Sequence, residues 1–163
     1  DHYDPRNKVL RLSDATYGQC SVAAVGVAAH ECGHAIQHAR GYAPLQFRSA
    51  LVPVANFGSM IAWPLIVLGL FINSQSSALL INIGILAFSL AVLFQLVTLP
   101  VEYNASGRAV RILAETGMMQ GEEIVATKKV LNAAALTYVA SAAAAILQLV
   151  RILILTGGRR RDD

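Results

Sequence analysis

The fold is decided by residues 49–101, which read SALVPVANFGSMIAWPLIVLGLFINSQSSALLINIGILAFSLAVLFQLVTLPV. This run of 53 residues contains no Asp, Glu, Lys, Arg or His. Residues 51–72 and 78–99 are each 22 residues long, or about 33 Å as helices, which is enough to cross about 30 Å of hydrocarbon. The uncharged polar stretch 73–77 predicts a tight turn between them. We therefore expect a transmembrane hairpin.

A third apolar segment follows at residues 130–156 and is rich in alanine, which is typical of close helix–helix contacts in lipid. Residues 1–48 carry five Lys and Arg and residues 101–129 carry four, whereas the turn at 73–77 carries none. The positive-inside rule places both basic segments in the cytoplasm. If the third segment spans, the arginines at 159–161 lie outside, against that rule, so a re-entrant or interfacial helix is the alternative.

The composition excludes several classes of protein. Charged residues make up 14% of the 163 residues, against about 25% in soluble domains, and apolar residues make up 55%. Disordered chains, disulfide-stabilised miniproteins and ordinary soluble enzymes do not have this pattern. The net charge of +3 comes from scattered Lys and Arg, so we expect no nucleic-acid partner. The sequence indicates a multi-pass protein of the cell membrane.

The polar segments predict a small folded unit made from residues 1–48 and 100–129. Residues 8–12 alternate charged and apolar side chains, which favours a short edge strand. Ser21 is a good N-cap for a helix that Gly41 would end. Further helices are expected to begin at Pro100 and near Gly121.

One helical motif carries the chemistry. His30-Glu31-Cys32-Gly33-His34 is an HExxH sequence, and side chains four residues apart share one face of a helix. Two imidazoles can therefore bind a single Zn²⁺ ion, while Glu31 acts as the general base on a water molecule. The motif predicts Glu31 as a catalytic residue and His30 and His34 as metal ligands.

Zinc in an enzyme needs a third protein ligand and an open fourth position. His38 lies eight residues from His30, about 12 Å along a helix axis, so we expect it to support or pack against the site. Glu102 is the better candidate, because the hairpin returns the chain to the side of the membrane that it left. The alternatives are three carboxylates further along the chain, Glu115, Glu122 and Glu123.

Arg108 has two possible roles. It lies six residues beyond Glu102, which is about 600° of helical rotation and so 120° away around the helix. From there it could stabilise the oxyanion of a reaction intermediate, or it could be an interfacial cation. Residues 8–12 could likewise pair with an extended substrate by main-chain hydrogen bonds.

Several segments together resemble a known family, the YugP-type membrane zinc metallopeptidases (neutral zinc metallopeptidases). They are DHYDPR at 1–6, LRLS at 10–13, HECGHAIQH at 30–38 and PVEYNAS at 100–106. The chain is more distantly similar to the HtpX and CAAX-protease class. The resemblance implies a zincin-like (gluzincin) unit with Zn²⁺ held by His30, His34 and Glu102 and with Glu31 as catalytic base. It also implies a further membrane helix on the N-terminal side of Asp1.

The sequence departs from these relatives at three positions. Cys32 stands where Val or Leu is usual, and a small thiol is expected to be tolerated there. Ser106 replaces the Asp of the distant class, so any carboxylate that supports a ligand histidine has to come from elsewhere. Gly107 replaces a larger residue and could loosen the helix that carries Glu102.

Taken together, these patterns predict a mainly α protein with integral membrane helices, a small cytoplasmic catalytic unit and a short edge strand. The expected function is that of a zinc endopeptidase facing the cytoplasm, with peptides or membrane proteins as substrates. It could also belong to a membrane complex or homo-oligomer. The alternative is a non-catalytic zinc-binding membrane protein that acts as an interaction partner in a membrane assembly.

Overall fold

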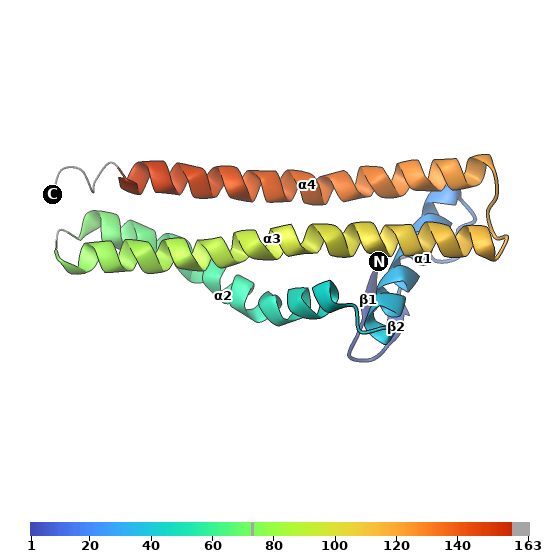
Figure 1. The fold of residues 1–163 in the computed structure, drawn as a ribbon, viewed down its shortest axis with the longest axis horizontal. Coiled ribbons are helices and arrows are strands. Elements are labelled where there is room, and N and C mark those ends of the chain that lie inside the picture. Colours follow the sequence, from blue (N-terminus) through green and yellow to red (C-terminus); the bar gives the residue numbers. More distant parts are fainter. Residues whose placement is uncertain (73, 158–163) are drawn as a thin grey trace. The chain divides into compact units, whose positions relative to one another are not determined.

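In a computed structural model, which describes residues 1–72 and 74–157, the chain is mainly helical with one two-stranded sheet (Figure 1). The elements in chain order are β1 His2–Asp4, β2 Val9–Arg11, α1 Val22–Ala39, α2 Ala43–Phe71, α3 Ser76–Glu115 and α4 Glu122–Gly157. Helices α2, α3 and α4 are long and apolar enough to cross a membrane. The prediction of a mainly α chain with a short strand is confirmed.

The chain forms two compact units. The first comprises Asp1–Gln46 and Thr98–Tyr138, and the second comprises Phe47–Val97 and the chain from Val139 onward. The first unit takes in the beginning of α4, which the sequence analysis had assigned to the third apolar segment. It therefore includes the first turns of α4, as far as Tyr138.

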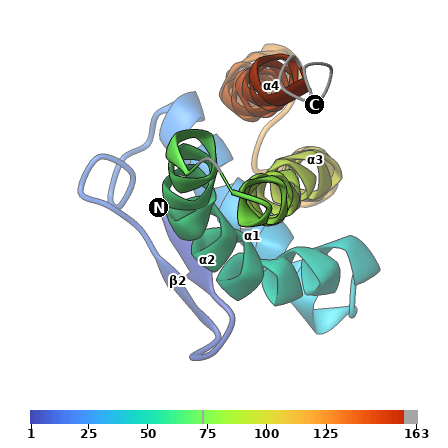
Figure 2. The same ribbon diagram turned by 90° about the vertical axis from the view of Figure 1, so that its left-hand side faces the viewer.

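The sheet of the first unit is a hairpin of β1 and β2 (Figure 2). The strands are antiparallel, with His2 opposite Arg11 and Tyr3 opposite Leu10. The alternating pattern predicted β2, but not β1, because β1 has no apolar alternation of its own. The Tyr3 hydroxyl oxygen lies 2.8 Å from Nδ1 of His38, which joins the hairpin to α1.

Helix α1 begins and ends where the sequence predicts. Oγ of Ser21 accepts a hydrogen bond of 3.2 Å from the backbone N–H of Ala24, which satisfies a helix-end donor. After Arg40 the chain turns at Gly41, which has a φ of +62°. The Gly41 N–H donates to the carbonyl of His38 at 3.1 Å and so closes the helix.

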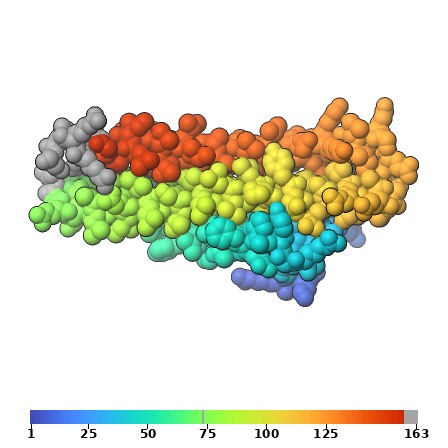
Figure 3. Space-filling view, in the orientation of Figure 1, coloured from blue at the N-terminus to red at the C-terminus, as the bar shows by residue number. Residues whose placement is uncertain are grey.

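Helix α3 is longer than expected. The prediction that a new helix begins at Pro100 is wrong, because α3 runs without interruption from Ser76 to Glu115 (Figure 1). The side chains of this helix are the green to yellow-orange atoms of the space-filling view (Figure 3). Proline removes one helical N–H, and membrane helices tolerate this loss when other groups satisfy the freed carbonyl. The apolar run 78–99 and Glu102 therefore lie on one helix.

The helix expected to begin near Gly121 does begin there, at Glu122, but it is not short, because α4 continues through the third apolar segment to Gly157. It runs from Glu122 to Gly157 without reversing direction, which does not fit a re-entrant segment. The arginines at 159–161, which raised the topological conflict, lie outside the described residues.

The core of the first unit joins α1, α3 and α4. Its buried apolar residues come from all three helices and the turn before α4: Ala29, Ala109, Leu113, Met119 and Leu131. The closest approach lies within the HExxH segment, where Gly33 faces the backbone of Ala105. A Cβ atom on Gly33 would overlap the Ala105 carbonyl oxygen. The absence of a side chain at Gly33 thus brings α1 against the part of α3 that carries Glu102.

In the second unit, glycines also allow close contact between two helices, α2 and α3. Three glycines each lie against the opposite helix, which lets the helix backbones approach closely, as small residues do in membrane proteins. The pairs are Gly58 with Ala87, Gly69 with Ile81, and Gly84 with Ile66.

Candidate metal centre

Helices α1 and α3 of the first unit bring together two imidazoles and a carboxylate. Nε2 of His30 lies 3.1 Å from Oε2 of Glu102, and Nε2 of His34 lies 3.5 Å from the same oxygen. The two Nε2 atoms are 3.1 Å apart. Among the described residues, these three form the one group of His, Cys, Asp and Glu side chains placed to share a metal ion.

The three distances fit zinc. Zn²⁺ binds His nitrogen and carboxylate oxygen at about 2.0–2.1 Å in tetrahedral sites, so two ligand atoms of such a site are about 3.3 Å apart. The observed separations of 3.1, 3.1 and 3.5 Å lie close to this value. The donor set is the nitrogen and oxygen set that zinc accepts. These residues could therefore hold a zinc ion with one tetrahedral position left open.

Glu102 is a buried carboxylate, with 2% of its surface exposed, and it lies three residues beyond the apolar run 78–99. Burial raises the pKa of Glu102, but hydrogen bonds from His30 and His34 outweigh it and lower the pKa from 4.5 to about 2. The side chain is therefore an anion at neutral pH, as a metal ligand has to be.

Gln37 fixes the orientation of His34. Its side chain is fully buried, and its Nε2 donates to the carbonyl of Val101 at 2.8 Å. Because a carbonyl can only accept, the Gln37 oxygen has to face Nδ1 of His34, which lies 3.0 Å away. In the neutral imidazole Nδ1 of His34 then carries the proton, and Nε2 has a lone pair for a metal. The sequence analysis did not identify Gln37 as part of the site.

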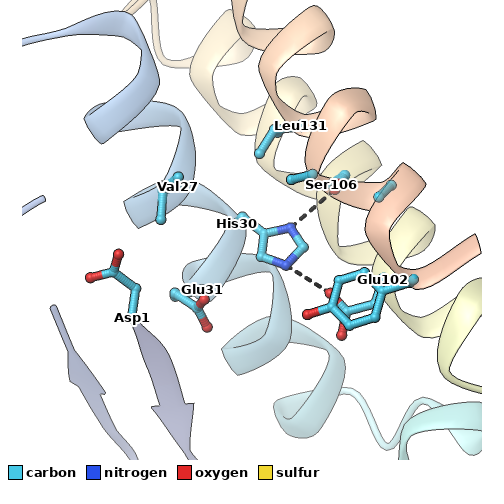
Figure 4. Close-up of a pocket in the computed structure, with 10 residues that line it drawn as sticks. Asp1, Val27, His30, Glu31, Glu102, Ser106 and Leu131 are labelled. Carbon is cyan, nitrogen blue, oxygen red and sulfur yellow. Dashed lines mark hydrogen bonds and ion pairs between the residues drawn. The ribbon is translucent and has the colours of Figure 1, made fainter. Parts of the chain in front are cut away.

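Ser106 contacts the other ligand histidine, His30. Its Oγ lies 3.0 Å from Nδ1 of His30, on the opposite side of the ring from Glu102 (Figure 4). The expectation was that any carboxylate supporting a ligand histidine would come from elsewhere. At His30 the partner of Nδ1 is the serine hydroxyl instead of a carboxylate. Its position one helical turn after Glu102 was the available signal, since both then face α1.

Arg108 is linked to Gln37 through the side chain of Asn104. Gln37 Nε2 also donates to Oδ1 of Asn104 at 3.0 Å, and Arg108 Nε donates to the same oxygen at 2.8 Å. The guanidinium lies over the ring of Tyr42, 5.8 Å from its centroid. Arg108 is not among the residues that line the cavity beside the three ligands. A role in transition-state stabilisation stays a prediction.

Beside the ligands lies a cavity of about 220 Å³. Glu31, with 8% of its surface exposed, lines it together with His30 and Glu102. Figure 4 shows Glu31 and Asp1 on the side of His30 away from Ser106. The remaining lining residues are apolar apart from one serine and one tyrosine: Val27, Ser106, Leu131, Ala134, Ala135 and Tyr138. The cavity is large enough to hold water beside Glu31, His30 and Glu102.

The other candidate residues lie elsewhere. His38 contacts Tyr3, and the carboxylates proposed as alternatives to Glu102 are exposed on α3 and α4: Glu115, Glu122 and Glu123. Cys32 is half-buried. Burial, and secondly the charge of Glu31, raise the pKa of the Cys32 thiol, so it stays protonated and is a poor zinc ligand.

The comparisons with known proteins agree with this donor set. A family model described as "Putative neutral zinc metallopeptidase" matches residues 1–157. The chain belongs to the neutral zinc metallopeptidase family. It is also 46% identical over 160 residues to "Putative membrane protease YugP" of Bacillus subtilis (strain 168), which covers 98% of this chain and 70% of that protein. No solved structure matches the chain.

In this neutral zinc metallopeptidase, the family name and the side chains point to the same metal. The family is named for zinc, and His30, His34 and Glu102 form a group that could bind it. The relative is named a membrane protease, and three helices here are able to cross a membrane.

Proposed function

We propose that this neutral zinc metallopeptidase is a membrane-embedded zinc endopeptidase whose first unit is a gluzincin-type catalytic unit. The observation that carries the proposal is the triangle formed by His30 Nε2, His34 Nε2 and Glu102 Oε2, with edges of 3.1, 3.1 and 3.5 Å. The triangle borders a cavity that Glu31 also lines. A structural zinc site has four protein ligands, whereas three ligands beside an open cavity are typical of a catalytic site.

The residues divide the chemistry among them. Zn²⁺ held by His30, His34 and Glu102 would polarise the carbonyl of the scissile bond and make water more acidic. Glu31 takes a proton from the attacking water and then gives it to the nitrogen of the leaving amine. Each transfer uses the same carboxylate, so Glu31 ends the cycle as it began.

The side chains behind the ligands hold them in position. Gln37 and Ser106 each contact the Nδ1 atom of one ligand histidine and so direct its Nε2 toward the third ligand. Partners of this kind keep the tautomer and the ring orientation of a metal-binding histidine.

The position of Glu102 on α3 supports a substrate near the membrane. Glu102 follows the apolar run 78–99 by three residues on one unbroken helix. Peptides or membrane proteins that approach the lipid surface are therefore the proposed substrates. The distribution of Lys and Arg favours a cytoplasmic active site. Assembly into a membrane complex or homo-oligomer stays a prediction.

The first test measures zinc and cleavage on the detergent-purified chain. We expect one zinc per chain by elemental mass spectrometry and loss of most of it in Glu102→Gln. Glu31→Gln should keep the metal and lose hydrolysis of an unstructured protein such as casein. Glu115→Gln, on an exposed carboxylate of the same helix, is the matched control and should change neither property.

The outcome separates the enzyme from its alternative. Zinc that persists in Glu102→Gln would exclude the proposed ligand set. Zinc binding without any cleavage by the parent would favour a non-catalytic zinc-binding membrane protein.

A further inference from the structure

The first unit contains a second cavity, of about 380 Å³, that is lined by α3 and α4. Two of its lining residues, Ser106 and Leu131, also line the cavity beside the metal centre, so the two cavities adjoin. We call the second one the α3–α4 cavity. Its other lining residues do not line the first cavity: Tyr103, Gly107, Val110, Arg111, Lys128 and Asn132.

The charged side chains that line the α3–α4 cavity are both cationic. Arg111 comes from α3 and Lys128 from α4, and no carboxylate is among the described lining residues. The cavity beside the metal centre has the opposite character, because three carboxylates line it. Within the part of the chain that the structure describes, neither Arg111 nor Lys128 forms an ion pair. The α3–α4 cavity therefore offers positive charge and hydrogen-bond donors to an anion.

The position of this cavity along α3 favours an anion that comes from the water. With residues 78–99 as the span, Tyr103 lies about 6 Å and Arg111 about 18 Å beyond the hydrocarbon along the helix axis. The layer of lipid head groups is about 5–8 Å thick on each side. Lys128 likewise precedes the apolar segment of α4, which begins at residue 130. The cationic end of the cavity therefore lies about 10 Å beyond the head groups, away from the lipid phosphates.

An acidic side chain of a polypeptide fits the chemistry of this cavity. Its carboxylate accepts charge-assisted hydrogen bonds from a guanidinium and an ammonium group, and the amide of Asn132 can donate as well. Its methylene groups can pack against the apolar lining, which Val110, Leu131 and the ring of Tyr103 supply. Gly107 leaves room for it, because a Cβ atom there would meet no atom within 4 Å.

We propose that the α3–α4 cavity is a subsite that binds an Asp or Glu side chain of the polypeptide substrate. This proposal rests on the proposed peptidase function and adds a substrate preference to it. Because Ser106 and Leu131 line both cavities, the acidic residue lies only a few residues from the scissile bond in an extended peptide, which advances about 3.3 Å per residue. The preference therefore applies to one fixed position relative to the cleaved bond.

The test measures this preference on zinc-loaded full chains in detergent. Mass spectrometry of casein fragments made by the parent gives a cleaved site. Synthetic peptides of that site, neutral elsewhere, then carry Glu or Gln at each position in turn. At one position we expect Glu to raise kcat/KM about five- to tenfold over Gln, as for a charge-assisted contact that solvent partly screens. The gain should lie in KM, because the subsite does not contact the reacting atoms.

Substitutions in the cavity should change the preference in a predictable way. Arg111→Gln/Lys128→Gln should cleave the Glu and Gln peptides equally. Arg111→Glu/Lys128→Glu should reverse the preference, so that a peptide with Lys at the same position is cleaved faster than the Gln peptide. Gly107→Leu should weaken the preference for Glu by filling the cavity while both cations remain. Lys129→Gln, on an exposed lysine that does not line the cavity, is the matched control and should keep the parental preference.

A binding measurement checks the same contact without turnover. A fluorescent form of the Glu peptide is titrated with Glu31→Gln, and its anisotropy reports the bound fraction. We expect Kd to rise about five- to tenfold when Arg111→Gln and Lys128→Gln are added to Glu31→Gln. The Gln peptide should bind the two proteins equally.

Four outcomes would overturn the proposal. The active parent could cleave the Glu and Gln peptides equally at every position, which removes the subsite alone. Lys129→Gln could lower the preference as much as the double variant, which would indicate an effect of net charge. Phosphatidylglycerol, compared with phosphatidylcholine, could raise the melting temperature of the parent but not of Arg111→Gln/Lys128→Gln, which would assign the cavity to a lipid phosphate. If the zinc-loaded parent cleaves nothing, the peptidase function fails and the subsite fails with it.

Discussion

The side-chain oxygen of Gln37 lies 3.0 Å from Nδ1 of His34, and this contact selects the tautomer of the imidazole. The amide cannot rotate by 180° without cost, since its nitrogen is held by the Val101 carbonyl at 2.8 Å. The backbone of α3 therefore orients Gln37, and Gln37 orients a residue of α1. The histidine is prepared for a metal by a partner that lies three residues further along the same helix.

Replacing Gln37 by methionine should weaken zinc binding. The change keeps an unbranched side chain of similar length but removes the acceptor for His34 and the donor to the Val101 carbonyl. Loss of such a partner typically costs 10–100-fold in metal affinity. We expect that loss in a competition titration against a chelator of known affinity. Gln46→Met, on an exposed glutamine, is the control, and equal affinities for the two variants would contradict the role of Gln37.

Ser106 offers a second test with variants that act in opposite directions. Ser106→Ala removes the group beside Nδ1 of His30 and should lower zinc affinity about tenfold. Ser106→Asp places a carboxylate there and should restore the affinity or increase it. The same competition titration measures both variants. Equal weakening by Ala and Asp would indicate that Ser106 only fills space. Ser141→Ala, on exposed α4 surface, is the control.

Zinc binding should weaken below neutral pH. Burial lowers the pKa of His34, but its hydrogen bond and charge attraction to Glu102 outweigh burial and raise the pKa above 6.5. Protons therefore compete with zinc for His34 already at a pH above 6.5. Glu102, with its pKa near 2, stays ionised throughout the usual range.

The corresponding measurement is a zinc titration between pH 5.5 and 8.5. We expect affinity to fall by at least about tenfold for each pH unit once the pH is below the pKa of His34, because each bound zinc then displaces a proton. An affinity that is constant between pH 8 and pH 6 would contradict the assignment of His34 as a ligand.

Two glycine substitutions should have opposite effects on stability. Gly33→Ala would force α1 away from the Ala105 carbonyl, and overpacking of this kind costs about 1–3 kcal/mol. Gly107→Ala would meet no atom within 4 Å and should gain up to about 1 kcal/mol from better helix propensity. Thermal unfolding in detergent measures both changes. We also expect Gly33→Ala to lose zinc affinity. Similar melting temperatures for the two variants would contradict the close contact between Gly33 and Ala105.

Much of the fold could be predicted from the sequence because its signals are local or compositional. The charge-free run 49–101 predicted two membrane helices, and Ser21 and Gly41 marked the limits of α1. The placement of Glu102 beside α1 followed from one argument about topology, that a hairpin returns to its starting side. The structure places the Glu102 carboxylate 3.1 Å from His30.

The remaining features depend on contacts between distant segments. Pro100 is a helix breaker by local propensity, but α3 continues through it. Gln37 and Ser106 are ordinary polar residues until the two helices are packed together. Tyr138 lies in a segment whose composition predicts lipid contact, and only the packing of α4 places it at the cavity.

The continuous course of α3 links the thickness of the bilayer to the geometry of the site. With residues 78–99 as the span, Glu102 lies about 4.5 Å beyond the hydrocarbon, within the layer of lipid head groups. One residue inserted into the span would raise the carboxylate by about 1.5 Å and rotate it by about 100° around the helix axis. The length of the span therefore cannot change without moving Glu102 relative to the histidines of α1. An insertion during evolution preserves the direction in which Glu102 points only if it adds whole turns of the helix.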